Sequence, residues 1–464
     1  MYKQFATLLI LVLVVGSVAL ADAKWGGIAR QLAMGGSMAS SGVVLNPYIV
    51  SDPSLMLINP AYQTMYRDYA WMNVGGGALN NLTTGNNGYG QQYSGGNLSL
   101  SKEFTLGAIF SYDPSAVNGI SALIAGGAPI PGGPALPSIV QRAGGAQTMP
   151  QVQNVFEIMG SYDAGELDFG FGATMGWAKN TSKTSTANAS SESEASARMI
   201  GFRAGILYDL GGGSSLDASA AIRMDKATDL QKSNTGSNGE YSASGTEVLF
   251  SVRAPLKASN KVKFVPYGAI ALMSAEPKED TPPTGVAAQK NTVKYSATAF
   301  AVGVGGEYKV GDGLIAGGLS LQSVKGKLEA SSPTGAGGAM QTATSTYTYT
   351  AIPVFNLGGE WSLADWLGFR AGYFRSIGSI TTKSEVGTTT TETEQSQPMS
   401  LVLVGGINNN SWDGIVTLGV GVKLGGLAFD ATVSEEALRR GFGLLGSNDN
   451  INTFGYITLS YNIE

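Results

Sequence analysis

Apolar and polar residues alternate with a period of two along most of this chain. From Leu167 to Trp177, one set of alternate positions holds Leu, Phe, Phe, Ala, Met and Trp, and the other holds Asp, Gly, Gly, Thr and Gly. The same alternation occurs in 216–225, 416–424 and 427–434. Because successive side chains of a β-strand point to opposite faces, each segment predicts a strand with one apolar face and one polar or small face.

The alternation divides the chain into sixteen predicted strands. They cover residues 69–79, 93–101, 104–112, 153–162, 167–178, 195–208, 214–226, 242–254, 261–274, 293–308, 313–325, 344–361, 367–380, 413–424, 427–434 and 452–463. Most have about 10–14 residues, which matches tilted membrane-spanning strands better than the shorter strands of globular sheets. In water the apolar faces would pack together as a sandwich, whereas in a bilayer they would face lipid. Lipid tolerates no open sheet edge, so we expect an all-β, antiparallel transmembrane barrel.

Short connections alternate with long ones rich in Thr, Ser, Asn and Gly, which are predicted to be extracellular loops. The long ones are 113–152, 179–195, 227–241, 276–292, 326–344, 379–412 and 435–450. One of them contains the polar, acidic, low-complexity segment 384–397, which is expected to be mobile. Aromatic residues near the strand ends are expected to mark the membrane interfaces. They are Trp71, Tyr112, Trp177, Tyr208, Trp361, Trp366 and Trp412.

Residues 1–23 have the pattern of a secretory signal peptide. Lys3 supplies a positive start, Leu8 to Val15 is an unbroken apolar run, and Ala21-Asp22-Ala23 places small residues at a cleavage site. The apolar run is too short to span a membrane comfortably, which disfavours the alternative of a single membrane anchor. We therefore expect an exported chain.

The next segment, residues 24–67, lacks the alternation of the predicted strands. It is interrupted by Asn46-Pro47, Asp52-Pro53 and Asn59-Pro60. A barrel of this size has a wide lumen that needs a plug unless it is an open pore. We therefore expect 24–67 to fill the lumen, and the barrel to comprise 68–464. The alternative is a disordered periplasmic tail, in which the apolar residues 55–58 would be poorly placed in water.

Composition excludes most enzyme classes. The chain has no His and no Cys, which removes Ser-His-Asp hydrolysis, thiol catalysis, disulfides and the usual zinc and iron–sulfur sites. Charged residues are only 14%, and the formal net charge is -5. A sequence pI of about 5.1 argues against a nucleic-acid partner. We expect no enzyme activity, no cofactor and no metal.

Several short motifs follow one another in a definite order. Near the N-terminus they are Leu32-Ala33-Met34-Gly35-Gly36, Ser51-Asp52-Pro53-Ser54 and Asn59-Pro60-Ala61. Farther along they are Gly359-Glu360-Trp361 with Asp365-Trp366, Phe369-Arg370-Ala371-Gly372-Tyr373, Leu418-Gly419-Val420-Gly421-Val422, Leu427-Ala428-Phe429-Asp430 and Ile457-Thr458-Leu459-Ser460-Tyr461. Together they resemble FadL-type outer-membrane transporters of long-chain fatty acids and hydrophobic compounds, and the related PorV-like barrels.

The resemblance implies a bacterial outer-membrane barrel of fourteen strands with an N-terminal hatch, whereas the alternation gives sixteen. We favour fourteen, with sixteen as the alternative, because reading strands from the alternation can split irregular stretches. Two features depart from the family's pattern. The last residue is Glu464, where such barrels usually end in Phe or Trp, and residues 46–50 lengthen the hatch. The resemblance assigns Gly35, Gly36, Asp52 and Asn59-Pro60-Ala61 to the hatch. Asn59-Pro60-Ala61 would be a rigid element near the ligand and not a catalyst.

Two further sets of residues are candidates for binding. The predicted loop 113–152 is unusually apolar, at Ile120, Leu123, Ile124, Ile130 and Leu136 among others, and forms either an apolar ligand groove or packing at the barrel mouth. Arg203, Arg223, Arg253 and Arg370 fall at predicted inward positions. They are placed to bind a carboxylate head group, or to pair with Asp168, Asp217, Asp225, Glu247 or Asp430.

The leading hypothesis is a passive, hatch-controlled channel for hydrophobic small molecules such as long-chain fatty acids, with membrane lipid and an apolar ligand as its partners. The first alternative is a PorV-like barrel that acts as a partner in protein secretion or surface attachment. A water-filled general porin is a third hypothesis, which the apolar hatch disfavours, and an enzyme is a distant fourth.

Overall fold

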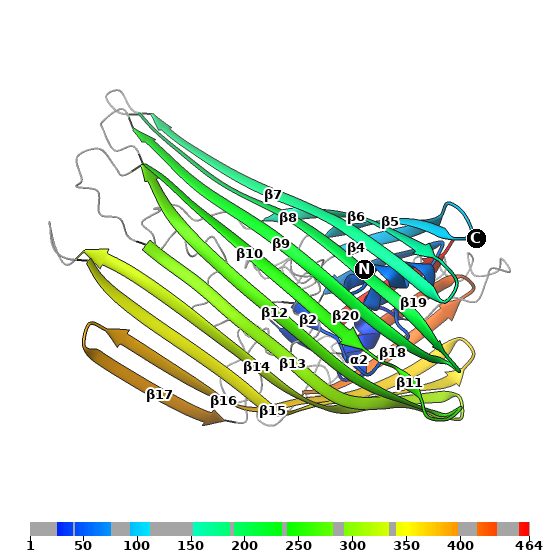
Figure 1. The fold of residues 1–464 in the computed structure, drawn as a ribbon. Helices are drawn as coiled ribbons and strands as arrows, with labels where there is room; N and C mark the ends of the chain where they lie inside the picture. The colour runs from blue at the N-terminus through cyan, green and yellow to red at the C-terminus, as the bar shows by residue number, and fades with distance from the viewer. Residues whose placement is uncertain are drawn as a thin grey trace, which may run out of the picture.

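The computed structural model describes residues 26–39, 42–75, 93–111, 152–185, 190–233, 239–281, 292–333, 340–397, 415–433 and 454–463 (Figure 1). The predicted signal peptide, Tyr112, Trp412 and the predicted apolar loop residues Ile120, Leu123, Ile124, Ile130 and Leu136 lie outside these ranges.

The strands from β3 onward form one closed antiparallel barrel with sixteen places in its wall. They are β3 (Tyr69–Gly75), β4 (Tyr93–Ser99), β5 (Phe104–Ser111), β6 (Gln153–Asp163), β7 (Leu167–Ser185), β8 (Ser190–Gly211), β9 (Ser214–Ser233), β10 (Gly239–Arg253), β11 (Leu256–Lys257), β12 (Val262–Thr281), β13 (Thr292–Val310), β14 (Gly313–Pro333), β15 (Met340–Ala364), β16 (Leu367–Val386), β17 (Thr389–Gln397), β18 (Ile415–Leu424), β19 (Leu427–Val433) and β20 (Phe454–Asn462). β10 and β11 both pair with β12, and β17 and β18 both pair with β16, so each of these two pairs fills one place.

The wall therefore has the sixteen strands that the alternation gives, which was the alternative, and not the fourteen that the resemblance implies and that we favoured. Closure follows from the pairing of the last strand, β20, with the first, β3. Consecutive strands pair all round the ring, as expected when every backbone donor and acceptor must be satisfied inside the sheet.

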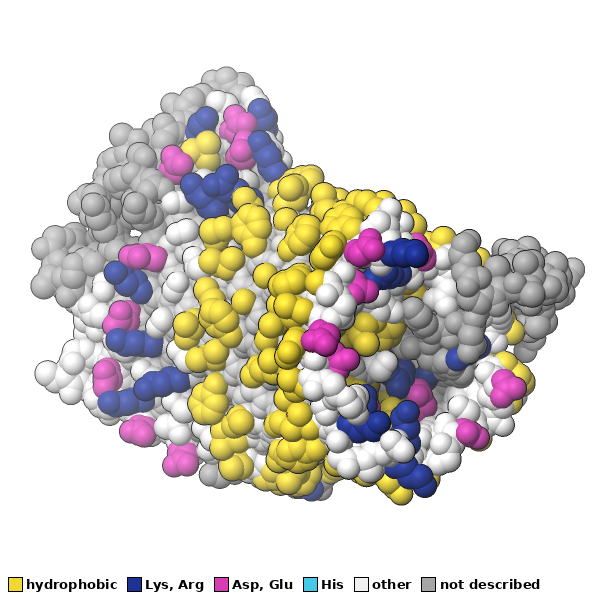
Figure 2. All heavy atoms as spheres, turned by 45° about the vertical axis from the view of Figure 1, so that its right-hand side comes forward, with side chains coloured by type: hydrophobic (Ala, Val, Ile, Leu, Met, Phe, Trp, Pro, Cys, Tyr) yellow, Lys and Arg dark blue, Asp and Glu magenta, His cyan; other side chains and the backbone are white. Residues whose placement is uncertain are grey.

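The alternation of side chains is the one that the sequence predicts. On β7 the apolar residues Phe171, Met175 and Trp177 are exposed on the outer surface, while the Gly and Thr residues between them face inward and are buried. Phe202 on β8 and Phe250 on β10 are likewise exposed. Figure 2 shows the resulting band of hydrophobic side chains across the outer wall.

The wall differs in height around the barrel. β7 to β10 and β12 to β16 have 15–25 residues, whereas β3 to β6 and β18 to β20 have 7–11. We call β7 to β16 the tall wall. Beyond the hydrophobic band its outward positions are mostly Ser, Thr, Lys and Glu, which are coloured white, blue and magenta at the left of Figure 2.

Several segments that we predicted to be loops are part of the strands of this tall wall. Much of 179–195, 227–241, 276–292, 326–344 and 379–412 continues the strands instead of leaving them. Segment 384–397, which we expected to be mobile, is a hairpin of β16 and β17 that turns at Gly387, where φ is 59°. Its threonines are β-branched and favour strand, which outweighs the low complexity of the segment.

Of the five predicted interface aromatics that the structure describes, four lie on the outer surface and one does not. Trp177, Tyr208, Trp361 and Trp366 are 38–59% exposed on the outer surface. Trp71 instead is only 8% exposed and stacks on Tyr69 inside the barrel, at a centroid distance of 5.8 Å. Trp71 lies on a short strand beside the N-terminal segment, which covers it.

Residues 26–67, which we call the N-terminal segment, hold the other regular elements. These are α2 (Ile28–Ala33), the two-stranded sheet of β1 (Ser37–Ala39) and β2 (Gly42–Val44), and the 3₁₀ helices η1 (Pro53–Leu57) and η2 (Pro60–Thr64). No helix in the described ranges is long and apolar enough to cross a membrane. The segment lies within the ring of strands, near the end where the short turns are (Figure 1).

Candidate functional site

The N-terminal segment touches the inner wall on all sides. α2 packs against β16, β18, β19 and β20, and η2 packs against β5, β6, β7 and β8. Tyr48, between them, donates its hydroxyl to the Leu319 carbonyl on β14 at 2.6 Å. Nearly all of 26–63 whose burial is described is buried. The segment is therefore held by contacts that surround it and not by one edge.

Asn59-Pro60-Ala61 starts η2 and fixes it to the wall. The Asn59 Oδ1 accepts from the backbone N–H of Ala61 at 2.9 Å, so Asn59 caps the helix, while Pro60 occupies its first position. The Asn59 Nδ2 donates to Asp217 Oδ1 at 2.6 Å and to the Ile206 carbonyl at 3.0 Å. Both the acceptor and the donor group of this side chain form structural hydrogen bonds, as expected for a rigid element.

Glycines on the wall make room for this motif. A Cβ at Gly205 of β8 would lie 1.9 Å from Asn59 Oδ1, and a Cβ at Gly170 of β7 would lie 2.1 Å from the backbone nitrogen of Ala61. The Asn59 side chain and the Ala61 backbone can approach the wall this closely only because glycine has no side chain.

A buried ion pair lies beside the motif. Arg253 on β10 binds Asp217 Oδ2 through Nε at 2.9 Å and through its terminal nitrogen at 2.6 Å. It also donates to the carbonyls of Pro47 and Ile49, at 3.2 Å each. Tyr62 donates its hydroxyl to Asp217 Oδ2 at 3.0 Å, and burial raises the pKa of this hydroxyl well above its usual value, so it stays protonated. The arginine thus joins the wall to two backbone positions of the N-terminal segment.

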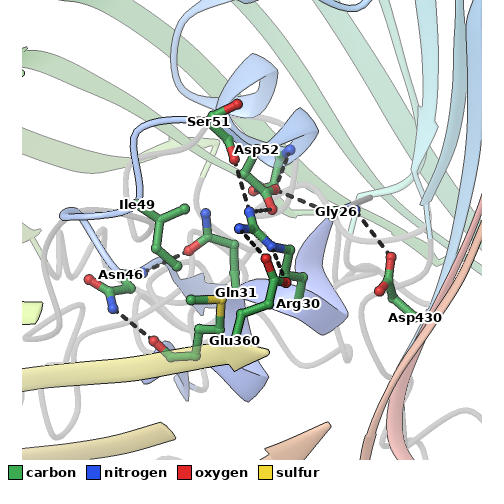
Figure 3. A network of polar contacts seen from close by, with 12 residues as sticks. Gly26, Arg30, Gln31, Asn46, Ile49, Ser51, Asp52, Glu360 and Asp430 are labelled. Carbon is green, nitrogen blue, oxygen red and sulfur yellow. Dashed lines mark hydrogen bonds and ion pairs between the residues drawn. The ribbon is translucent and has the colours of Figure 1, made fainter. Parts of the chain in front are cut away.

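A second network surrounds Arg30 of α2 (Figure 3). Its guanidinium binds both oxygens of Glu360 on β15, at 2.8 and 3.1 Å, and Asp52 Oδ2 at 3.0 Å. Asp52 also accepts from Gly27 N at 3.0 Å and caps η1 through Ser54 N at 2.9 Å. Burial by itself lowers the pKa of Arg30, but the attraction of Glu360 and Asp52 holds it well above its usual value, so the side chain stays charged.

The network extends to the late strands. Arg370 on β16 binds Glu360 Oε2 and Asp430 Oδ1 of β19, at 2.5 Å each. The other Asp430 oxygen accepts from Gly26 N at 3.1 Å. A chain of ion pairs therefore runs from Asp52 through Arg30, Glu360 and Arg370 to Asp430, and alternates in charge at every step.

Arg203 on β8 forms a third contact of the same kind. It binds Glu157 on β6 through Nε at 2.8 Å and through Nη2, and its Nη1 donates to the carbonyls of both Met56 and Leu57. Both ionic side chains are at most 1% exposed. The carbonyls at the end of η1 thereby find donors on the wall.

The four candidate arginines are therefore all ion-paired, which is the second of the two interpretations given by the sequence. Asp217, Asp225, Glu247 and Asp430 are partners as expected. Glu157 and Glu360 were not expected, and Asp168 instead accepts from Thr64. Arg223 differs from the others, because its side chain is 26% exposed and binds Asp225 and Glu247 above the N-terminal segment.

Gly35 and Gly36 follow α2. Gly35 has φ 81°, and Asn356 on β15 donates to its carbonyl at 2.7 Å. Gly36 N donates to the Gln31 carbonyl at 2.8 Å and closes the end of the helix. A Cβ at Gly35 would lie 2.4 Å from the Leu357 carbonyl oxygen, so this position has no room for a side chain larger than that of glycine.

Sequence reasoning missed Arg30, Glu360, Asn356 and Glu157 as site residues. One signal was present, since Arg30 is a lone cation between Ile28 and Leu32, and a charge in an apolar helix needs a buried partner. The identity of that partner, 330 residues away, depends on how the barrel closes.

Little space remains between the segment and the wall. A cavity of about 10 Å³ lies among Gly27, Leu57, Tyr69 and Trp71, which is room for about one water molecule.

Above the N-terminal segment, inward positions of the tall wall are apolar. We call these residues the apolar lining: Ala195, Met199, Ala227, Ala243, Leu249, Ala271, Tyr295, Ala297, Ala299, Val324 and Tyr349. All are less than 9% exposed. Apolar side chains therefore line part of the inner face of these strands, beside the buried polar residues Asp229, Glu247 and Gln322.

The closed antiparallel barrel, its outward hydrophobic band and its polar rim define a transmembrane β-barrel of the bacterial outer membrane. No family model and no curated protein matches the chain. The resemblance to the FadL family stays a prediction.

Solved structures with low similarity include three outer-membrane proteins. The ferric yersiniabactin uptake receptor FyuA from Yersinia pestis is 9% identical over 84% of this chain and 79% of its own, with a TM-score of 0.34. The translocator domain of autotransporter NalP from Neisseria meningitidis is 13% identical over 64% and 88%, with a TM-score of 0.26. The ferric citrate transporter FecA is 10% identical over 80% and 69%, with a TM-score of 0.34. These scores assign no function to the chain.

Proposed function

We propose that this protein is a passive channel for hydrophobic small molecules such as long-chain fatty acids, and that residues 24–67 are its hatch. The apolar lining carries the proposal. Polar solutes gain nothing from apolar walls, whereas an apolar ligand that leaves water gains roughly 25 cal/mol for each Å² of apolar surface that it buries. The FadL resemblance points to the same class of cargo.

The position of the N-terminal segment supports a hatch. Asn59, Arg30 and Asp52 are used on contacts that fix the segment, and none is free to act as a catalyst. The path from the apolar lining past the segment requires that some of these contacts break. We therefore propose neither a catalytic step nor a cofactor, and a route that is opened by movement of the hatch.

The ionic contacts suit a part that must both close and move. Each buried arginine binds carboxylates or carbonyls between the segment and the wall. A moved hatch would expose these groups to water, which solvates ions well, so the cost of separating them falls as water enters.

The test is whole-cell uptake of a labelled long-chain fatty acid, in a Gram-negative host whose own fatty-acid channel has been deleted. The test variant is Met199→Gln/Leu249→Gln in the apolar lining. The control is Leu230→Gln, the same chemical change at an outward position of the polar rim on β9.

We expect cells with the wild-type protein to take up more fatty acid than cells with an empty vector. The lining variant should reduce this gain in uptake at least fivefold, and the control should keep the gain within twofold of wild type. Equal uptake by vector and wild type would refute the proposal. Co-purification with large secreted proteins and without bound lipid would favour the PorV-like alternative instead.

A further inference from the structure

Charged residues on the outer surface of the tall wall occur mainly as opposite-charge pairs. Lys179 pairs with Glu194 at 2.8 Å, Lys183 with Glu192 at 2.9 Å, and Lys294 with Glu276 at 3.1 Å. Lys327 with Glu329 and Lys383 with Glu385 form two more, at 2.5 Å each. An exposed sheet is stabilised by such pairs and destabilised by like charges that face each other.

Arg198 on β8 and Lys226 on β9 break this pattern. They are direct partners in the antiparallel register, both are exposed, and both point outward. Within the described ranges neither has an acidic side chain at ion-pair distance, in contrast to the pairs above. Two cations held side by side on a wall that otherwise neutralises its charges form a site for an anion from outside the chain.

The level of this cation pair on the barrel identifies the surroundings of the anion. On the same strands, one outward step toward the membrane, lie Ile200 and Met224, which are 44% and 42% exposed. Trp177, the direct partner of Arg198 on β7, is 59% exposed. Figure 2 shows basic side chains gathered at the edge of the hydrophobic band. Acyl chains meet their head groups at this boundary, and tryptophan is enriched there.

A hollow lies on the same outer surface, next to the cation pair. It has a volume of about 350 Å³, and its lining includes Ser244, Thr246, Ser274, Ser296 and Tyr295, with the Lys294–Glu276 and Lys327–Glu329 pairs at its side. Ser244 is the direct partner of Lys226 in the sheet and so joins the two features. Small hydroxyl side chains and neutral ion pairs suit the hydroxyls of a sugar.

We propose that the outer surface of β8 to β13 binds a phosphorylated glycolipid of the outer leaflet. Its phosphate binds between Arg198 and Lys226, its sugar ring occupies the hollow, and its acyl chains lie on the hydrophobic band below. Arg198 presents paired N–H donors that match two phosphate oxygens, and Lys226 adds a compact charge. This proposal concerns the outer surface and does not depend on the cargo of the lumen.

The experiment is titration of the purified full-length protein in detergent, followed by native mass spectrometry. The probes are a bis-phosphorylated, acylated glucosamine disaccharide, the same lipid without its phosphates, a simple phosphatidic acid and inorganic phosphate. The cation-pair variant is Arg198→Gln/Lys226→Gln. The matched control is Lys183→Gln/Lys383→Gln, which removes two cations from other strands of the same wall. Ser274→Phe fills the hollow. Heat-dependent gel mobility checks that each variant is a folded barrel.

We expect the cation-pair variant to bind the phosphorylated glycolipid at least tenfold more weakly than wild type, and the control to bind within twofold of it. Removing the phosphates from the lipid abolishes the difference between the variants. Ser274→Phe weakens the glycolipid and leaves phosphatidic acid unchanged.

Three results overturn the proposal. They are equal losses in the cation-pair variant and the control, equal wild-type affinity for the lipid with and without phosphate, and competition by inorganic phosphate at the concentration of the lipid. The last result would mean a free-phosphate site. A Ser274→Phe variant that binds both lipids normally would remove the sugar from the assignment.

Discussion

Replacing Arg30 by methionine tests how the N-terminal segment is held. Removing one member of a buried ion pair costs about 3–5 kcal/mol when the other is left alone. Here Glu360 keeps Arg370, and Asp52 keeps Gly27 N and Ser54 N, so both carboxylates retain partners. We therefore expect Arg30→Met to lower the free energy that holds the segment in place by about 2–3 kcal/mol. At about 1.36 kcal/mol for each factor of ten, this raises the open fraction of the segment roughly 30- to 160-fold.

The chain has no cysteine, so a single introduced thiol reports on this opening without interference. Val50→Cys places the thiol at a position that is 8% exposed within the segment. Its rate of reaction with a water-soluble maleimide follows the open fraction when opening and closing are faster than labelling. Ser51→Cys, at an exposed position, gives the rate for an open thiol.

The control is Arg67→Met in the same Val50→Cys background. It removes one cation from the same segment, but from a pair with Asp163 in which the side chains are 24% and 39% exposed. Such a pair contributes about 0–1 kcal/mol, so labelling should rise by a factor of about five at most. Equal labelling rates in the Arg30 and Arg67 variants would refute the reasoning that the buried network holds the segment.

Three further predictions concern the motif and the wall. Gly205→Ala should displace Asn59 and speed Val50→Cys labelling at least tenfold, because its Cβ would lie 1.9 Å from Asn59 Oδ1. Gly268→Ala, whose nearest neighbour is 3.8 Å away, should leave the rate unchanged, and the reverse order would contradict the close-packing argument. Asn59→Ala removes the cap of η2 and a contact with Asp217, and should lower the stability of the segment by about 1–3 kcal/mol. The same labelling assay measures this, and an unchanged labelling rate would show that the motif is not structural. Phe250→Arg, in the hydrophobic band, should lower the free energy of unfolding by about 2–4 kcal/mol, measured by urea unfolding from lipid vesicles. Thr228→Arg, in the polar rim, should lower it by only about 0–1 kcal/mol. Equal losses would mean that the band does not face hydrocarbon.

The sequence predicts the wall well because lipid imposes a period of two. The alternation in 167–177 and 216–225 marks which residues face outward, and the structure agrees at each of these strands. Strand ends are predicted poorly where the outward residues become polar. β7 continues to Ser185, and β16 turns directly into β17, because Ser and Thr form strands in water as well as turns.

The contacts within the lumen are predicted only in part. Arg253, Arg370, Asp217 and Asp430 alternate into the lumen, so their inward orientation follows from their strands. Their pairing depends on register and on the path of the N-terminal segment, which has no period to read. Trp71 shows the same limit, because its burial is caused by a segment that is not part of the wall.

The central claim is that the N-terminal segment closes this barrel. The most direct test of this claim is the ion conductance of the protein in planar bilayers. Wild type and a variant that lacks residues 26–67, both verified as folded barrels, are inserted into the same membrane. We predict that wild type passes almost no current and that the deletion variant opens stable channels. Equal conductance of the two proteins would contradict the account.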